Sequence, residues 1–399
     1  MTDQPGSTPT TDPPSHRSSR MGRWLIIAGR VLWLELVGAY ALVSLYVFLE
    51  RLDGGNPGAD FVIFYAASLL TMAGEAAALF DWPTFRAAQA TVIQGPINYL
   101  PWLYPPPLLL ITAPLANLPY LPAFAVWVLG QLVLLAVAVR GMGRDGATLA
   151  AILAALVFPA TINNLLAGQN GALSAALLAG GLLALNRHPY FAGVMFGCLI
   201  YKPQLALMLP VALLAVGAWR TIAAGLASAV ALSLLSLAAF GAAPWSAFFA
   251  NTATSTGILE HAAAHWSKMA TVFAALRLLG VEISVACGAQ AAAAARDGMA
   301  VIYIWRRNAG PHLRGSALLL ATFLATPYAF FYDLVVLIFA ILWLGQGEVG
   351  RYGRPVLALL WLAPVALWVL AHYGQVSLWP VLLGGCLAWI CWRAGREAA

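Results

Sequence analysis

The sequence predicts an all-α integral membrane protein, a polytopic bundle of about 12 membrane-spanning helices. Hydrophobic residues make up 62% of the 399 residues and charged residues 9%, whereas a soluble globular domain carries about 25% charged residues. Apolar runs recur from end to end, with no second, polar domain between them. The basic residues are dispersed between these runs, which argues against a nucleic-acid-binding patch despite the net charge of +6.

Short apolar spans and two prolines complicate the bundle. Several spans fall below the roughly 20 residues that a crossing helix needs, and Pro203 and Pro327 interrupt longer apolar runs, so the flanking spans are expected to be kinked or re-entrant. The expected spans lie at about 24–49, 120–139, 147–162, 170–186, 188–201, 203–217, 219–240, 281–305, 313–326, 328–344, 355–372 and 376–393. Residues 1–23 are expected to form a disordered cytoplasmic tail, and 24–399 a single transmembrane domain.

The arginines orient this bundle. With about 12 spans, most of the arginines between spans fall on one side, which the positive-inside rule makes cytoplasmic. The two long connections, about 50–119 and 241–280, then lie on the outer face. So do seven acidic residues, Glu50, Asp53, Asp60, Glu75, Asp81, Glu260 and Glu282. The proline-rich apolar piece 104–118 is expected to re-enter the bilayer or to lie in its outer leaflet.

Asp60 is the first candidate for chemistry. It follows the first apolar span and opens an aromatic segment, Asp60-Phe-Val-Ile-Phe-Tyr-Ala-Ala. A carboxylate at the mouth of a helical bundle can accept a proton from an attacking hydroxyl, or hold a divalent cation that neutralises a phosphate. The alternative is an ordinary solvated loop aspartate.

Lys202 and Asp333 are charged residues inside or beside apolar spans, where a charge is costly unless it is paired or hydrated. Lys202 stands at a Lys-Pro-Gln break, and a lipid-linked phosphate is a natural partner for its ammonium group. The alternatives are a lysine that extends to the headgroups and a carboxylate that bonds a neighbouring helix.

Polar and aromatic residues of the outer face are further candidates for substrate contacts. Gln169 lies in a Gly-Gln-Asn turn, where its neighbour Asn170 suits a helix cap better than a ligand contact. Tyr65 and Tyr104 can stack on a sugar or anchor at headgroup depth. His261 and His265 have the i, i+4 spacing of a metal site without the glutamate of a zinc peptidase, and they also suit an exposed loop helix. A divalent cation is compatible with these residues, and none of them defines a metal site.

Six motifs occur in order along the chain. They are Asp60-Phe-x-x-Phe-Tyr-Ala-Ala, Tyr104-Pro-Pro-Pro-Leu, Gly168-Gln169-Asn170, the stretch from Ala192-Gly193 to Lys202-Pro203, Met269 to Gly280 with Arg277, and Pro327-Tyr328 to Tyr332-Asp333. Together they resemble the family 87 glycosyltransferases, integral-membrane α-mannosyltransferases that use polyprenol-phosphate mannose. The resemblance covers nearly the whole chain from about residue 24.

The resemblance implies a C-type glycosyltransferase fold in the bacterial cytoplasmic membrane, with the active site facing the extracytoplasmic side. It implies Asp60 as catalytic base and a polyprenyl-phosphate sugar as donor, with mannose the expected sugar. It also implies a glycolipid or polysaccharide acceptor and inversion at the anomeric carbon. Lys202 would stabilise the departing phosphate.

Two other classes of function compete with this hypothesis. A multi-pass transporter or lipid flippase is expected to show internal repeats and polar residues near the midplane, and neither is visible in the sequence. A non-catalytic membrane scaffold would make Asp60 replaceable. Sensitivity of activity to Asp60→Asn separates the enzyme from the scaffold.

Overall fold

The computed structural model divides the chain into two units, residues 1–47 and 48–399. In the first unit it describes only positions 38, 40 and 42, which are helical, and in the second it describes position 58 and residues 60–93, 100–143, 148–251, 266–307, 309–346 and 353–397. The account that follows concerns the second unit. His261 and His265 lie outside the described residues.

The described part of the chain is helical and contains no strand; an isolated antiparallel bridge joins Met269 to Phe330. The α-helices are α2 (Phe61–Met72), α3 (Trp82–Val92), α4 (Leu109–Thr112), α5 (Tyr120–Arg140), α6 (Thr148–Leu156), α7 (Pro159–Ala167), α8 (Gly171–Ala184), α9 (Pro189–Gly197), α10 (Met208–Ala215), α11 (Trp219–Phe240), α14 (Val272–Leu278), α15 (Ile283–Arg306), α16 (Pro311–Ala325), α17 (Leu337–Gln346), α18 (Gly353–Gly374) and α19 (Trp379–Glu397). Short 3-10 helices are η1 (Ala76–Phe80), η2 (Pro106–Leu108), η3 (Ala113–Asn117), η4 (Cys198–Tyr201), η5 (Pro203–Ala206) and η6 (Phe331–Val336).

Most helices follow the expected apolar spans within a few residues where the chain is described. The span expected at 147–162 differs: it is two helices, α6 and α7, bent by 51° before Pro159, and α7 continues to Ala167. Among the described helices, three are long and apolar enough to cross a membrane, namely α5, α11 and α18. The bent pair α6–α7 adds a fourth crossing if it forms one span. The all-helical membrane architecture is therefore confirmed, and the expected count of about 12 spans stays a prediction.

The helical breaks occur where proline predicts them. Lys202 separates η4 from η5 with φ −137° and ψ 65°, and Pro203 begins the next short helix. After α16 the backbone is extended at Thr326, and helix resumes only at Phe331. Proline removes a backbone donor and constrains the residue before it, so each break frees backbone and side chains for other contacts.

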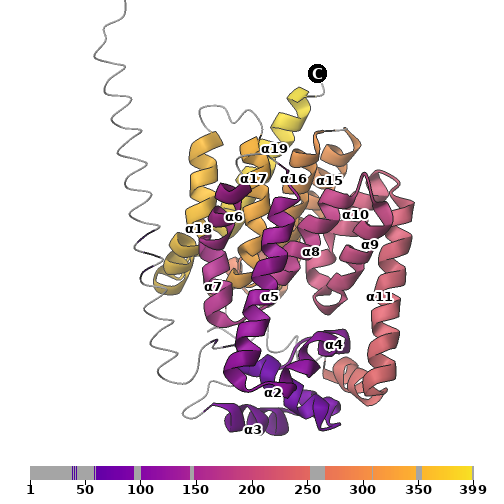
Figure 1. The fold of residues 1–399 in the computed structure, drawn as a ribbon. Coiled ribbons are helices and arrows are strands. Elements are labelled where there is room, and N and C mark those ends of the chain that lie inside the picture. The colour runs from indigo at the N-terminus through magenta and orange to yellow at the C-terminus, as the bar shows by residue number, and fades with distance from the viewer. Residues whose placement is uncertain are drawn as a thin grey trace, which may run out of the picture. The chain divides into compact units, whose positions relative to one another are not determined.

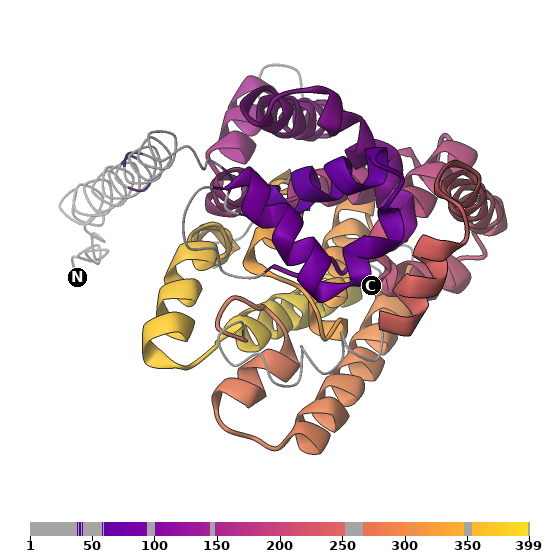
Figure 2. The ribbon, with the colours of Figure 1, turned by 90° about the horizontal axis from the view of Figure 1, so that it is seen from below.

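The segment from α2 to η3 packs as a small helical layer across one end of the bundle (Figure 1). The view from below shows the indigo and purple helices of this layer in front of the remaining helices (Figure 2). Its core is aromatic: Phe61, Phe64 and Trp102 are at most 1% exposed. Phe61 and Phe64 pack on Trp127 of α5, and Trp102 packs on Phe64. Burying rings of this size is worth roughly 1.5–3 kcal/mol per side chain, so this layer has a core of its own that fixes the start of α2.

Candidate functional site

The start of α2 is docked onto the end of α7. Gly168 ends α7 in the left-handed conformation, with φ 70°. A Cβ atom at Gly168 would lie 2.6 Å from the Cβ atom of Phe61, so only glycine allows this approach and this backbone conformation together. The Asp60 N–H donates a hydrogen bond of 2.8 Å to the Ala167 carbonyl. The Gly168-Gln169-Asn170 turn and Asp60, distant in sequence, are thereby brought together.

The Asp60 carboxylate is directed at this turn. Asp60 occupies the N-cap position of α2, but its side chain makes no capping hydrogen bond. Instead Oδ2 accepts a hydrogen bond of 2.9 Å from Nε2 of Gln169. Asp60 is half-buried and Gln169 is buried, and a hydrogen bond to a charged group contributes about 1.5–3 kcal/mol. Asp60 is therefore an oriented carboxylate and not a freely solvated loop residue.

Tyr104 fixes the orientation of the Gln169 amide. The Tyr104 hydroxyl, in the loop before η2 and outside the candidate spans, donates a hydrogen bond of 3.1 Å to Oε1 of Gln169. Burial raises the pKa of the Tyr104 phenol well above its usual value, so it remains a donor. With Oε1 held in this way, the Gln169 amide must present its N–H group to Asp60.

Two side chains of α5 hold the backbone of the turn. Trp127 donates from Nε1 to the Gly168 carbonyl at 3.0 Å, and Gln131 donates from Nε2 to the Gln169 carbonyl at 3.0 Å. Neither residue was among those predicted from the sequence. Gln131 carried a usable signal, because a buried amide in the middle of an apolar span requires partners.

Lys202 and Asp333 form a buried ion pair. The Lys202 Nζ donates to Oδ1 of Asp333 at 2.5 Å, and each side chain is 3% exposed. Oδ2 of Asp333 accepts a hydrogen bond of 3.1 Å from the Phe330 N–H. Removing one partner of such a pair leaves an uncompensated buried charge and costs about 3–5 kcal/mol. The two residues, expected to act separately, are thus one structural unit, and the partner of Lys202 here is a carboxylate.

Aromatic rings connect this ion pair to the Asp60 network. The Lys202 ammonium lies 5.9 Å from the ring centre of Tyr104 and 5.2 Å from that of Tyr332, within the reach of cation–π attraction. Tyr332 in turn stacks on Phe330, with ring centres 5.3 Å apart. Tyr104 therefore belongs to both parts, because its hydroxyl contacts Gln169 and its ring faces Lys202.

Tyr65 is the remaining site candidate that the structure describes. The Tyr65 hydroxyl donates to the Leu118 carbonyl at 2.8 Å, and its ring packs on Phe61 and Tyr120. Neither this hydrogen bond nor these ring contacts reach the Asp60 carboxylate or Gln169. Asn170 stands at the N-cap of α8 but makes no capping hydrogen bond, so the expectation that it caps a helix was wrong. Its buried amide lies near the Tyr104 hydroxyl without a hydrogen bond of ordinary geometry to a described group.

Metal ligands are sparse around this site. Within the described ranges, no group of three or more His, Cys, Asp or Glu side chains is placed to hold a metal ion. Asp60 is engaged by Gln169 and Asp333 by Lys202. A divalent cation here would therefore take most of its oxygen ligands from water or from a substrate phosphate, as Mg²⁺ commonly does.

Fold and site together define a helical membrane protein with an oriented carboxylate and a buried cation at one end of its bundle. The model of glycosyltransferase family 87 matches residues 102–327, more than half of the chain. The chain belongs to glycosyltransferase family 87 and is a membrane glycosyltransferase, which uses a sugar donor and an acceptor. The matched region includes Tyr104, Gln169 and Lys202, whereas Asp60 and Asp333 lie outside it. Comparisons with curated proteins and with solved structures gave no match.

Proposed function

We propose that this chain transfers a sugar from a polyprenyl-phosphate donor to an acceptor hydroxyl, with inversion at the anomeric carbon. Mannose is the sugar that we propose first. The donor and sugar are those implied by the sequence resemblance. The observation that carries the proposal is the chain of hydrogen bonds from Tyr104 through Gln169 to the Asp60 carboxylate. Membership of a glycosyltransferase family favours this function over a transporter or a scaffold.

Asp60 acts as the general base in this mechanism. The acceptor oxygen attacks the anomeric carbon as the bond between that carbon and the phosphate oxygen breaks, through a transition state with oxocarbenium character. The hydroxyl proton passes to the Asp60 carboxylate, and the bonding electrons leave with the polyprenyl phosphate. The hydrogen bond from Gln169 orients the carboxylate before the acceptor arrives.

Lys202 supplies positive charge toward the leaving phosphate. An ammonium group has three donors, and the recorded hydrogen bond of Lys202 uses one of them, to Asp333. A phosphate that approaches along the Tyr104 and Tyr332 rings would share the ammonium with Asp333. The two tyrosine rings exclude water on their sides, which strengthens this attraction.

The charge balance of the site requires a further cation. Asp60, Lys202 and Asp333 together carry one net negative charge when all are ionised, which opposes an anionic donor. Lys268 is one candidate, because its carbonyl accepts a hydrogen bond of 2.8 Å from the Phe331 N–H, two residues before Asp333. Arg277 is another, because its guanidinium lies 4.5 Å from the ring centre of Trp266, which packs in the same cluster as Phe330 and Tyr332. A divalent cation bound with the donor is a third candidate.

The arginines at the end of the bundle opposite α2 support an orientation of the site in the membrane. Arg140, Arg187 and Arg314 lie at or just beyond the ends of α5, α8 and the start of α16, at the opposite end of the bundle from α2. By the positive-inside rule that end is cytoplasmic, so we assign the Asp60 end to the extracytoplasmic side of a bacterial cytoplasmic membrane. Glycolipids or surface polysaccharides on that side are the acceptors that we propose.

The experiment uses the purified chain in nanodiscs with a radiolabelled polyprenyl-phosphate mannose donor. We expect turnover, or slow donor hydrolysis, that falls by about 10²–10⁴ in Asp60→Asn, the range for loss of a general base. Glu75→Gln is the matched control, because Glu75 is an exposed carboxylate in the same helical layer. Full activity of Asp60→Asn would remove Asp60 from the mechanism. A wild-type chain that neither binds nor consumes this donor would contradict the proposed donor.

A further inference from the structure

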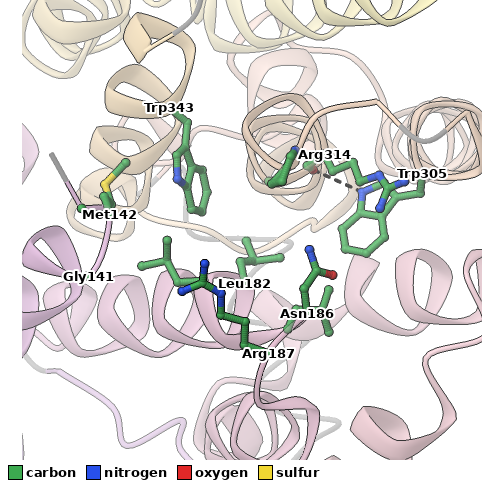
Figure 3. A pocket seen from close by; sticks show the side chains of 13 residues that line it. Gly141, Met142, Leu182, Asn186, Arg187, Trp305, Arg314 and Trp343 are labelled. Atoms are coloured by element: carbon green, nitrogen blue, oxygen red, sulfur yellow. Dashed lines mark hydrogen bonds between the residues drawn. The ribbon is translucent and has the colours of Figure 1, made fainter. Parts of the chain in front are cut away.

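A cavity lies at the basic end of the bundle, opposite the Asp60 site. It has a volume of about 490 Å³ and is lined where α5 and α8 end and where α16 begins. Trp305, near the end of α15, and Trp343, in α17, complete its walls. Figure 3 shows Trp343, Arg314 and Trp305 on one side of the cavity and Leu182, Asn186 and Arg187 on the other. The volume falls within the roughly 300–1,000 Å³ of small-molecule sites.

The walls of this cavity are built by close helix packing. A Cβ atom at Gly315 would lie 2.6 Å from the Trp343 ring, so the glycine lets α17 pack its indole against α16. Trp305 is 1% exposed and donates from Nε1 to the Arg314 carbonyl at 3.2 Å. Both indoles are therefore fixed by the fold. Asn186 and Arg187 are exposed, which places the mouth of the cavity on their side.

The charge in the cavity is positive. Arg187 and Arg314 are its charged lining residues, and among the lining residues that the structure describes none is acidic. The first turn of α16 adds the positive end of a helix dipole, whereas the ends of α5 and α8 add carbonyl groups of the opposite sign. Each helix end counts for about half an elementary charge, so the two guanidinium groups outweigh them. Arginine is suited to planar, bidentate binding of phosphate.

Apolar walls distinguish this cavity from a site for a small inorganic anion. Leu182, Leu183 and Met142 line it together with the two indoles. We propose that the cavity binds the phosphate of an anionic amphiphile, with Arg187 and Arg314 on the phosphate and the apolar walls on the start of its hydrocarbon chain. Basic pockets between membrane helices bind anionic lipid headgroups in this way. The proposal is independent of the transfer reaction, because it concerns the other end of the bundle.

The test measures lipid retention by native mass spectrometry on the full-length chain in detergent. The probes are phosphatidylglycerol, phosphatidylcholine with the same acyl chains, and inorganic phosphate. We expect one saturable phosphatidylglycerol that survives detergent washing, with phosphatidylcholine bound about tenfold more weakly. Competition by millimolar inorganic phosphate would identify the phosphate group alone as the ligand. If inorganic phosphate does not compete, the ligand is the whole amphiphile.

Paired variants locate the site. We expect Arg187→Gln and Arg314→Gln each to weaken retention about tenfold, the loss of one charge-assisted contact. The double variant Arg220→Gln/Arg307→Gln is the control, because it removes two exposed arginines from the same end that do not line the cavity. Arg187 is itself exposed, so its variant should fold even if the Arg314 variant does not. Equal retention by the Arg187 variant and the control, or no anionic preference in the wild type, would overturn the proposal.

Discussion

Gln169 donates its side-chain N–H to the Asp60 carboxylate at 2.9 Å and accepts the Tyr104 hydroxyl at its other end, at 3.1 Å. The Gln169 amide therefore links the buried Tyr104 to the proposed base by two hydrogen bonds. Trp127 and Gln131 hold the backbone of the same turn. Because both ends of its side chain are hydrogen-bonded in this way, we propose that Gln169 positions Asp60, in place of the substrate contact that the sequence suggested for it.

Replacing Gln169 by methionine should separate positioning from folding. Methionine keeps the length of the side chain but loses the donor to Asp60, a contact worth about 1.5–3 kcal/mol, so kcat should fall roughly 10–100-fold. KM for the donor should change little, because Gln169 is not proposed to bind it. The measurement is steady-state kinetics in nanodiscs, with membrane abundance as the control.

Tyr104→Phe completes that comparison. It removes only the hydroxyl that holds Oε1 of Gln169, while the ring that faces Lys202 remains. Its loss of kcat should be smaller than that of Gln169→Met. A larger loss for Tyr104→Phe than for Gln169→Met would contradict the order of positioning that we infer.

The Lys202–Asp333 pair should show strong coupling in a double-mutant cycle. Lys202→Met or Asp333→Leu alone leaves one buried charge unpaired and should lower the free energy of unfolding by about 3–5 kcal/mol. The double variant removes both charges and should lose much less than the sum of the two single losses. Thermal unfolding in detergent measures all four proteins, and additive losses would mean that the two groups do not depend on each other.

Gly168 should tolerate alanine less well than Gly74 does. Both have positive φ, 70° and 83°, and a left-handed alanine costs about 1–2 kcal/mol at either position. At Gly168 the new Cβ would also lie 2.6 Å from Phe61, whereas nothing lies within 4 Å at Gly74. Overpacking adds about 1–3 kcal/mol, so the Gly168→Ala variant should be less stable than the Gly74→Ala variant by about that amount. It should also lose activity. Denaturant unfolding and transferase assays on both variants check this.

Sequence patterns predicted the helices because hydropathy and proline act locally. Helices were confirmed over most of the apolar stretches that the structure describes, and so were the breaks beside Pro203 and Pro327. The sequence also selected the residues that meet in the buried network. It could not show that Lys202 and Asp333 would pair, because that contact joins segments 131 residues apart in the chain.

The helical layer around α2 explains why the remaining site residues escaped prediction. An aromatic residue beside a loop can face a substrate, the bilayer or a protein core, and its type does not decide among them. Phe61 and Phe64 proved to be fully buried. The positions of Trp127 and Gln131 depend in turn on how the Gly168 turn docks against that layer, which is a tertiary contact without a local sequence signal.

Tyr65 and Tyr104 can be distinguished by one pair of conservative substitutions. The Tyr65 hydroxyl donates to the Leu118 carbonyl at 2.8 Å, so its role in the structure is to join α2 to the residue after η3. Tyr65→Phe should lower stability by about 1 kcal/mol, the worth of one hydrogen bond, and should keep kcat within about twofold of the wild type. Thermal unfolding and kinetics on the same preparations measure both quantities. A large fall in kcat at unchanged stability would instead return Tyr65 to the substrate site that the sequence suggested for it.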